Sequence, residues 1–158
     1  MAEIDKAKAW QIYSTLIQML DGKKWKYERY DDELIIKSTV VGDDLPIDFT
    51  VAVRPENQVI QFISKLPFNI CEEKRVDGAI AVSVANYGLV DGSFDYDIRD
   101  GEIRFRLTCS YRDSQIGVEL LEYVILCAAT TVDRYNDRFF MLTKGMLTLQ
   151  QFIEQDKA

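Results

Sequence analysis

The sequence predicts an α+β fold in which an antiparallel sheet of about five to six strands carries helices packed on one face. Two observations predict this class. Apolar residues recur at helical spacing near both ends of the chain, and stretches rich in β-branched residues, separated by short turns, lie between them. Because hairpins connect neighbouring strands, the sheet should be mostly antiparallel, in the order α-β-β-β-β-α-β-β-α-α. The 158 residues, 47% of them apolar and 28% charged, fit a single domain over residues 1–158.

The first predicted element is a helix from about Ile4 to Leu20. Its apolar residues recur every three or four positions and so share one helical face. They are Trp10, Tyr13, Leu16, Ile17 and Leu20. Gly22 follows as the expected C-terminal stop. The segment Met1 to Lys8 carries four charged side chains and no apolar run, so we expect neither a signal peptide nor a membrane anchor there.

Four strands follow as a predicted meander, separated by turns at Gly42-Asp43-Asp44 and Pro55-Glu56-Asn57. The third strand begins at Pro46, and apolar residues occupy every second position in it, which puts their side chains on one face. Those side chains are Ile47, Phe49, Val51 and Val53. The other predicted ranges are Lys26–Tyr30, Leu34–Val41 and Gln58–Leu66.

A second helix is predicted over Glu72–Tyr87. An amphipathic helix turns its apolar stripe toward the core. The stripe of this helix consists of Val76, Ile80, Val84 and Tyr87. Small residues between them, such as Ala81 and Ala85, allow close packing.

The segment Ser93–Tyr111 is predicted to form a hairpin around the dipeptide Asp100-Gly101, a strong signal for a two-residue type I′ turn. Cross-strand charge pairs support the register that this turn implies. In that register the apolar pairs are Ile98–Ile103, Tyr96–Phe105 and Phe94–Leu107, and the charged pairs are Asp97–Arg104, Asp95–Arg106 and Arg99–Glu102.

A long helix is predicted from Ser114, as its N-cap, to Leu142, and a short one over Thr148–Gln155. The long helix is apolar nearly all round over Leu120–Ala129, which indicates burial on two sides. Two explanations stay open. The segment either lies between the sheet and the last helices or forms a twofold dimer interface.

Several classes of function are excluded by composition. The chain has no histidine, so Ser-His-Asp or Cys-His catalysis and His-ligated zinc are impossible within it. A net charge of −7 argues against nucleic acid as a partner. The densest basic cluster, Lys23, Lys24 and Lys26, is followed at once by acidic residues. No C-x-x-C, G-x-G-x-x-G or P-loop motif is present.

The cysteines indicate a reducing compartment. Cys71, Cys109 and Cys127 are odd in number, far apart and close to apolar residues, as is typical of buried free thiols. We therefore expect a cytoplasmic protein.

Three groups of residues are candidates for a site. The acidic cluster Asp91, Asp95, Asp97 and Asp100 fails the calcium-loop pattern, and the hairpin register explains it by arginine partners. Glu119 and Glu122 share a helical face but have no basic anchor, so a solvated edge is the better interpretation. Ser110, Tyr111 and Ser114 have no base beside them. We expect no catalytic, cofactor-binding or metal-binding residues, and the sequence does not single out partner-binding ones.

The segments Ala85–Phe94 and Asp100–Arg106 resemble the YbjN family, as does the tail Val132–Tyr135 with Gly145 beyond it. This resemblance implies a fold like that of type III secretion chaperones, which bind extended segments of partner proteins and often dimerise. The family is labelled as sensory-transduction regulators, and no functional residue transfers from it.

These observations together predict a non-enzymatic peptide- or protein-binding module, chaperone-like or regulatory, that forms a homodimer. A small-ligand sensor, or an enzyme of unrecognised class, is the alternative. A sensor would show an enclosed apolar cavity, and an enzyme a pocket lined by carboxylates with raised pKa.

Overall fold

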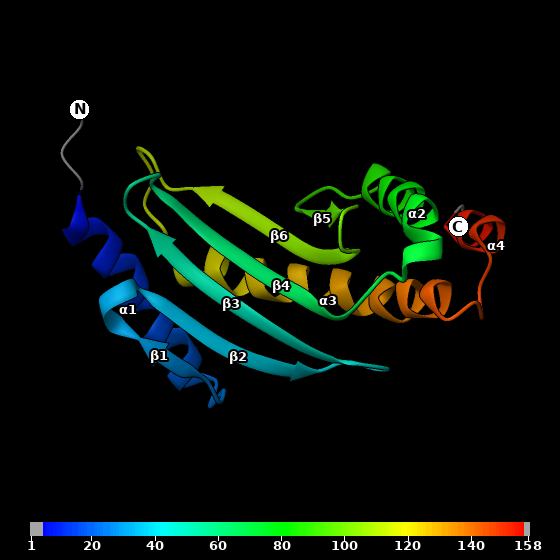
Figure 1. Ribbon diagram of the computed structural model, residues 1–158. Coiled ribbons are helices and arrows are strands. Elements are labelled where there is room, and N and C mark those ends of the chain that lie inside the picture. Colours follow the sequence, from blue (N-terminus) through cyan, green and yellow to red (C-terminus); the bar gives the residue numbers. More distant parts are fainter. Residues whose placement is uncertain (1–4, 157–158) are drawn as a thin grey trace.

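The computed structural model describes residues 5–156 and confirms the α+β class (Figure 1). Its six strands form one antiparallel sheet in the order β1-β2-β3-β4-β6-β5. The strands are β1 Glu28–Tyr30, β2 Ile35–Val41, β3 Pro46–Arg54, β4 Val59–Asn69, β5 Ser93–Asp97 and β6 Glu102–Ser110. The helices are α1 Lys6–Gly22, α2 Arg75–Tyr87, α3 Val118–Thr143 and α4 Leu149–Gln155. The predicted start of the first helix at Ile4 lies outside the described residues.

One face of the sheet carries the core, as predicted. Alternate residues of β3 are buried, and these are Ile47, Phe49, Val51 and Val53. Helix α3 packs behind β3, β4 and β6, and α1 lies beside it against β3 (Figure 1). The other face of the sheet is polar and open, because successive strand residues point to opposite sides.

Helix α2 covers the outer edge of the sheet rather than its face. The Asn86 side chain donates to the Phe94 carbonyl (2.9 Å) and accepts from the Phe94 amide (2.7 Å), as a neighbouring strand would. Close approach requires small residues on this side of α2. A Cβ at Gly78 would lie 2.7 Å from the Tyr96 hydroxyl.

This placement reverses the predicted orientation of α2. Its buried residues are the small ones and a valine, namely Gly78, Ala81, Val82 and Ala85. Three residues of the predicted stripe instead face outward, with Val76 66%, Ile80 42% and Tyr87 96% exposed, and the fourth, Val84, is half-buried against the core. The prediction was wrong because the helix packs closely against an edge strand, where large side chains do not fit. The first turn of the predicted helix, Glu72–Lys74, is 3₁₀.

The β5–β6 hairpin forms with a register two residues from the predicted one. Phe94 pairs with Phe105 and Tyr96 with Ile103, which leaves a four-residue loop over 98–101. The loop is held from outside the hairpin, since the Ile70 amide donates to the Gly101 carbonyl at 2.8 Å. A type I′ turn needs positive φ at both central residues. Gly101 has φ +79°, whereas Asp100 does not have a positive φ. Because the register shifts by two residues, an even number, the side chains that were predicted to share a face of the hairpin still share it.

Helix α3 begins later than predicted. Gly117 is its N-cap, and the Ser114 hydroxyl instead donates to the Arg112 carbonyl (3.0 Å). The chain turns before the helix at Asp113, whose φ is +51°. The long helix and α4 otherwise match their predicted ranges within a few residues.

The doubly apolar segment Leu120–Ala129 is buried on one side only. Its sheet side is Leu121, Val124, Ile125 and Ala128, all buried. On the other side Tyr123 and Leu126 remain 46% and 48% exposed. The explanation that this segment lies between the sheet and the last helices is therefore wrong. Helix α4 contacts α3 nearer the C-terminal end of α3, where Phe152 stacks on Phe139 (5.3 Å between centroids). The dimer explanation stays a prediction.

Candidate functional site

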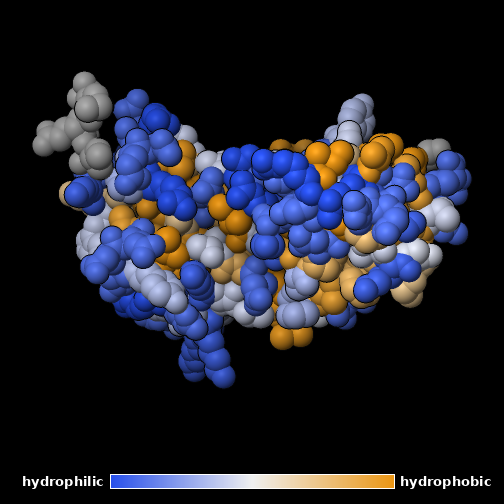
Figure 2. All heavy atoms as spheres, viewed as in Figure 1, coloured by the Kyte–Doolittle hydropathy of each residue, from blue (hydrophilic) through white to orange (hydrophobic). Residues whose placement is uncertain are grey.

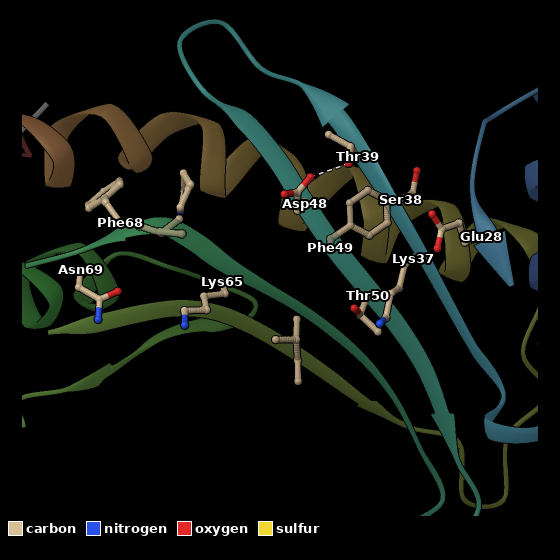
Figure 3. Close-up of a pocket in the computed structure, with 13 residues that line it drawn as sticks. Glu28, Lys37, Ser38, Thr39, Asp48, Phe49, Thr50, Lys65, Phe68 and Asn69 are labelled. Carbon is tan, nitrogen blue, oxygen red and sulfur yellow. Dashed lines mark hydrogen bonds between the residues drawn. The ribbon is translucent and has the colours of Figure 1, made fainter. Parts of the chain in front are cut away.

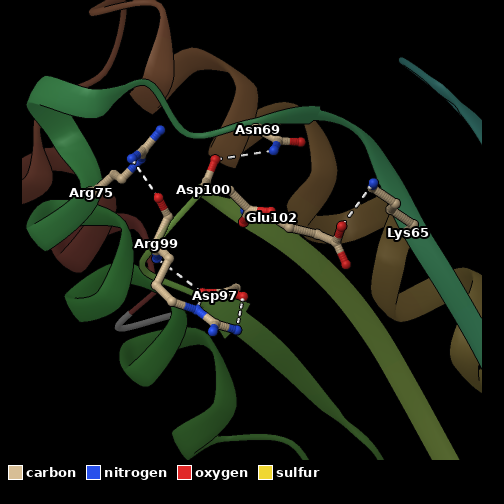
Figure 4. Close-up of polar contacts among 7 residues, drawn as sticks. All are labelled: Lys65, Asn69, Arg75, Asp97, Arg99, Asp100 and Glu102. Carbon is tan, nitrogen blue, oxygen red and sulfur yellow. Dashed lines mark hydrogen bonds and ion pairs between the residues drawn. The ribbon is translucent and has the colours of Figure 1, made fainter.

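The aspartates of the acidic cluster do not converge on one site, and each has its own partner. Figure 4 shows two of them, Asp97 and Asp100. Asp95 accepts from both Arg104 and Arg106, at 3.1 Å each, so one predicted arginine partner is confirmed and a second is added. Asp97 contacts Arg99 (2.7 Å) instead of its predicted partner, and this guanidinium, aided by the Arg99 amide, lowers the pKa of Asp97 to about 2.

The remaining members of the cluster also have separate partners. The Asp100 carboxylate accepts from the Glu102 amide (2.9 Å) and so fixes the hairpin loop. The Asp91 carboxylate accepts from the Tyr123 hydroxyl, and this contact raises the pKa of Tyr123. The predicted pair Arg99–Glu102 is wrong, since Glu102 binds Lys65 at 2.8 Å.

The other candidates do not converge on a common centre. Glu122 pairs with Lys23 (2.9 Å), so one member of the basic cluster is neutralised. Glu119 is exposed and Tyr111 is buried. Within residues 5–156, no group of three or more acidic, cysteine or histidine side chains could hold a metal ion.

All three cysteines are free and partly buried. Burial raises the pKa of the Cys109 thiol, which disfavours its nucleophilic thiolate form. Cys71 Sγ contacts the Thr143 carbonyl at 3.4 Å.

The open face of the sheet contains a feature that sequence reasoning missed, a fork between β3 and β4 (Figure 3). The two strands pair from Arg54–Val59 to Thr50–Ile63 and separate beyond that point. Residues 46–49 of β3 and 64–69 of β4 form the two arms, and we call this feature the β3–β4 fork. It holds an open hollow of about 680 Å³, a volume within the range of ligand sites.

Backbone groups of the β3 arm point into the fork. The Val53 amide donates to the Leu34 carbonyl beside β2 (3.0 Å), so the N–H and C=O groups of the even-numbered β3 residues face β4. The Asp48 carbonyl is satisfied by the hydroxyl of buried Ser64 at 2.7 Å. The Asp48 amide points to the same side, beyond the last β3–β4 ladder pair at Thr50–Ile63.

The β4 arm mirrors this arrangement. The Tyr111 amide donates to the Gln58 carbonyl (3.0 Å), so even-numbered β4 residues face the β6 side and Lys65 directs its amide and carbonyl into the fork. Pairing with β6 is irregular between Lys65 and Asn69, where Pro67 lacks a donor. The predicted end of this strand at Leu66, before the proline, was the one sequence signal of the fork.

The floor of the fork is apolar. Phe49 and Leu66 are 3% and 2% exposed, and Phe49 stacks on Phe62 with centroids 4.9 Å apart. Phe68 is half-buried and meets Phe140 of α3 edge to face at 5.4 Å. An apolar side chain that enters the fork would therefore contact aromatic and aliphatic carbon.

The rim of the fork is polar and carries both signs of charge. The Thr39 hydroxyl donates to the Asp48 carboxylate at 2.5 Å. The Lys65 ammonium binds Glu102, which raises the pKa of that lysine. Lys37 lies over the Tyr30 ring at 4.9 Å. Of these rim charges, Lys65 is neutralised by Glu102, whereas Asp48 and Lys37, one of each sign, contact a hydroxyl and a ring.

A second apolar surface is the outward face of α2. We define the α2 stripe as Val76, Ile80, Tyr87 and the following Val90, which is 95% exposed. Figure 2 shows hydrophobic side chains gathered at the upper right, where Figure 1 places α2. Isolated exposed apolar residues are common, but a contiguous row on one helix face marks an interaction surface.

Comparisons with known proteins agree with this architecture. The model of the YbjN family, described as "Putative bacterial sensory transduction regulator", matches residues 13–141. No curated protein matches the chain. The chain is similar in fold to the crystal structure of YbjN from E. coli, with TM-score 0.59, 13% identity, and coverage of 80% of this chain and 92% of the other.

Two further solved structures share the fold. A chain in the HopA1-SchA chaperone-effector complex matches with TM-score 0.55 and 11% identity, covering 85% of this chain and 99% of that one. A chain in the ExsC-ExsE complex matches with TM-score 0.54 and 11% identity, covering 80% and 92%. At such identities the likeness concerns the fold alone.

Proposed function

The chain belongs to the YbjN family, and we propose that it is a non-enzymatic protein-binding module, chaperone-like or regulatory. The β3–β4 fork is the observation that carries the proposal, because it joins an apolar floor to an open hollow beyond the end of the β3–β4 ladder. One fold neighbour is a chain of a chaperone-effector complex, which supports the same class of function. Residues 1–158 would act as one binding domain.

A peptide selection on the full chain tests this function. Random peptides of about 12 residues, long enough for one strand with flanks, are displayed and selected, and each Kd is measured by fluorescence polarisation. We expect micromolar binders. Ile63→Lys, at the apex of the fork, should weaken binding about tenfold or more, which corresponds to ~1.4 kcal/mol.

The matched control is Gln61→Lys, two residues back on the same strand and face but outside the fork lining. It should leave the Kd within about threefold. If the selection yields no binder, the function is wrong. Thermal stabilisation by a metabolite without peptide binding would favour the small-ligand sensor.

A homodimer through the α2 stripe is part of the proposal. With a net charge of −7, two copies repel one another at long range, so a dimer needs an apolar contact surface. The α2 stripe is more exposed than the apolar side of α3, with Tyr87 at 96% against 46% and 48% for Tyr123 and Leu126. In an antiparallel pair of α2 helices, Ile80 would lie near the twofold axis.

Light scattering tests the dimer at micromolar concentration. The native chain should have twice the monomer mass of 18.2 kDa, and Ile80→Glu should restore the monomer. Met146→Glu, an exposed apolar residue outside the stripe, is the control and should remain dimeric. A monomeric native chain would overturn this part of the proposal.

A cytoplasmic location completes the proposal. The free cysteines support a reducing compartment. No helix among residues 5–156 is long and apolar enough to cross a membrane.

A further inference from the structure

We propose that the outer part of the β2–β3 hairpin is a pH-responsive latch, whose turn docks on the Asp133 carboxylate of α3 and docks more tightly when Asp137 is protonated. We call this part of the hairpin, residues 38–49, the β2–β3 ribbon. The latch is separate from the proposed binding function, whereas its effect on the β3–β4 fork rests on that function. Three features of the molecule carry the proposal: the ribbon has no strand neighbour, its turn lies against α3, and carboxylates surround that contact.

The β2–β3 ribbon runs past the strands on either side of it. Strand β1 pairs with β2 only as far as Lys37, and β4 pairs with β3 only as far as Thr50 (Figure 3). Beyond these two residues, which face each other, the ribbon pairs with no third strand in the part of the chain that the structure describes. A two-stranded hairpin is marginally stable by itself. Contacts with the body of the protein therefore hold the ribbon in place.

The base and the turn of the ribbon are held by different contacts. At the base, Ile47 and Phe49 are buried in the core, and the Ser64 hydroxyl donates to the Asp48 carbonyl at 2.7 Å. At the turn, the Asp43 amide donates to the carboxylate of Asp133 at 2.9 Å. The base thus depends on apolar burial, whereas the turn depends on a charged group of α3.

Gly42 allows the turn to approach α3 closely. A Cβ at this position would collide with a carboxylate oxygen of Asp133 and would lie 2.8 Å from the Leu45 carbonyl oxygen. The backbone of the turn therefore lies directly against the Asp133 carboxylate. A hydrogen bond to an ionised acceptor is stronger than one between neutral groups, so this contact can act as the catch of the latch.

A second carboxylate of α3 belongs to the same contact. Asp137 follows Asp133 by four residues, so the two share a face of the helix. Burial, and after it the Asp44 carboxylate of the turn, raise the pKa of Asp137, while Arg138 of its own helix acts in the opposite direction. Asp48 lies on the other, exposed face of the ribbon. Asp44 is therefore the charge of the turn that opposes ionisation of Asp137.

The raised pKa of Asp137 gives the direction of the response. Ionised Asp137 repels Asp44 and is partly withdrawn from water, so the docked turn is disfavoured while Asp137 is charged. As the pH falls from neutrality through the raised pKa, Asp137 takes up a proton and both costs are removed. The latch is therefore tighter at mildly acidic pH. Residues 46–49 of the ribbon form one arm of the fork, so that arm is then held more firmly.

Reciprocal coupling gives a test that needs no ligand. If ionisation of Asp137 weakens docking, then displacement of the turn lowers the pKa of Asp137 toward its ordinary value. Gly42→Val displaces the turn and leaves every charge in place. Gly88→Val is the matched control, because no atom lies within 4 Å of its Cβ position. Carboxyl NMR titration of the full chain should show a lower pKa of Asp137 in Gly42→Val only. An equal pKa in the native chain and Gly42→Val overturns the latch.

Amide exchange of the native chain gives a second test. Protection of the Asp43 amide, relative to its rate in an unstructured peptide, should rise about threefold or more between about pH 7 and about pH 5. Asp137→Asn imitates the protonated side chain, so the amide should be well protected at both pH values. Glu119→Gln, at an exposed position of the same helix, should retain the native pH dependence. Equal protection of the native chain at both pH values contradicts the proposal.

The effect on the fork is measured with a peptide from the selection. A firmly held arm is preorganised, so the Kd of the native chain should fall about threefold between about pH 7 and about pH 5. The Kd of Asp137→Asn for the same peptide should change less. Equal changes in both chains overturn control of the fork and leave the latch standing. Failure to select any peptide overturns the binding function, whereas the titration and exchange experiments still decide the latch, since they use the chain alone.

Discussion

Replacement of Gly101 by alanine is expected to lower the free energy of unfolding by about 1.5–3.5 kcal/mol. Gly101 has φ +79°, and a left-handed backbone costs an L-residue about 1–2 kcal/mol. A Cβ there would also lie 2.1 Å from the carbonyl oxygen of Ile70. The loop would have to move, and the 2.8 Å bond from the Ile70 amide to Gly101 would be lost, at about 0.5–1.5 kcal/mol.

Two other glycines separate these contributions. Gly145 has φ +73°, and no atom lies within 4 Å of the position that a Cβ would take, so Gly145→Ala should cost only the backbone part, about 1–2 kcal/mol. Gly88 has φ −95° and similarly open space. Gly88→Ala should be neutral or stabilising by up to about 1 kcal/mol.

Urea unfolding, followed by circular dichroism, measures the free energy of unfolding of all three variants, which can be compared when their m-values agree. We expect Gly101→Ala to be the most destabilised and Gly88→Ala the least. If Gly101→Ala and Gly145→Ala lost stability equally, the contact with Ile70 would contribute nothing. The bond from Ile70 would then not explain why the hairpin has a four-residue loop.

Three further outcomes are expected. Asn86→Ala removes both partners of the Phe94 backbone and should lower the free energy of unfolding by about 1–3 kcal/mol in a urea titration; an unchanged midpoint would contradict the edge-covering role of α2. The pKa of Asp97 is lowered to about 2, so its stabilising contribution is complete above about pH 4 and is lost as the pH falls toward 2. In Arg99→Ala, NMR titration should show that pKa returning toward its ordinary value. Burial and a hydrogen-bonded carboxylate raise the pKa of Tyr13 to about 12, so its contribution holds below about pH 10 and is lost as the pH rises through 12. Tyr13→Phe should remove one step near pH 12 from the ultraviolet titration, and an unaltered curve would refute the assignment.

Most elements of the fold could be predicted because their signals are local. Alternation placed Ile47 to Val53 on the buried face of β3, and helical spacing located α1, α3 and α4. The absence of histidine and the net charge of −7 exclude whole classes of chemistry on composition alone. The family resemblance was confirmed over residues 13–141.

The errors arose where a distant contact overrode a local preference. The Asp100-Gly101 pair favours a two-residue turn, but the bond to Ile70 holds a longer loop. The apolar stripe of α2 has the period of a buried face, yet packing against the edge strand required Gly78 and its small neighbours to face inward. Periodicity indicates that a face is apolar, and only the neighbouring element decides whether that face is covered.

The elements, their order, the antiparallel sheet and the chemistry that this chain lacks all follow from residue type and short-range spacing, and so could be predicted before the fold was known. The β3–β4 fork could be seen only in the folded chain, since the separation of two strands depends on how each packs against its other neighbours. Ser64 and Pro67 are ordinary residues in the sequence. The β3–β4 ladder ends at Thr50–Ile63, and beyond that point the Ser64 hydroxyl takes the place of a strand partner for the Asp48 carbonyl. Pro67 lies in the stretch of β4 whose pairing with β6 is irregular.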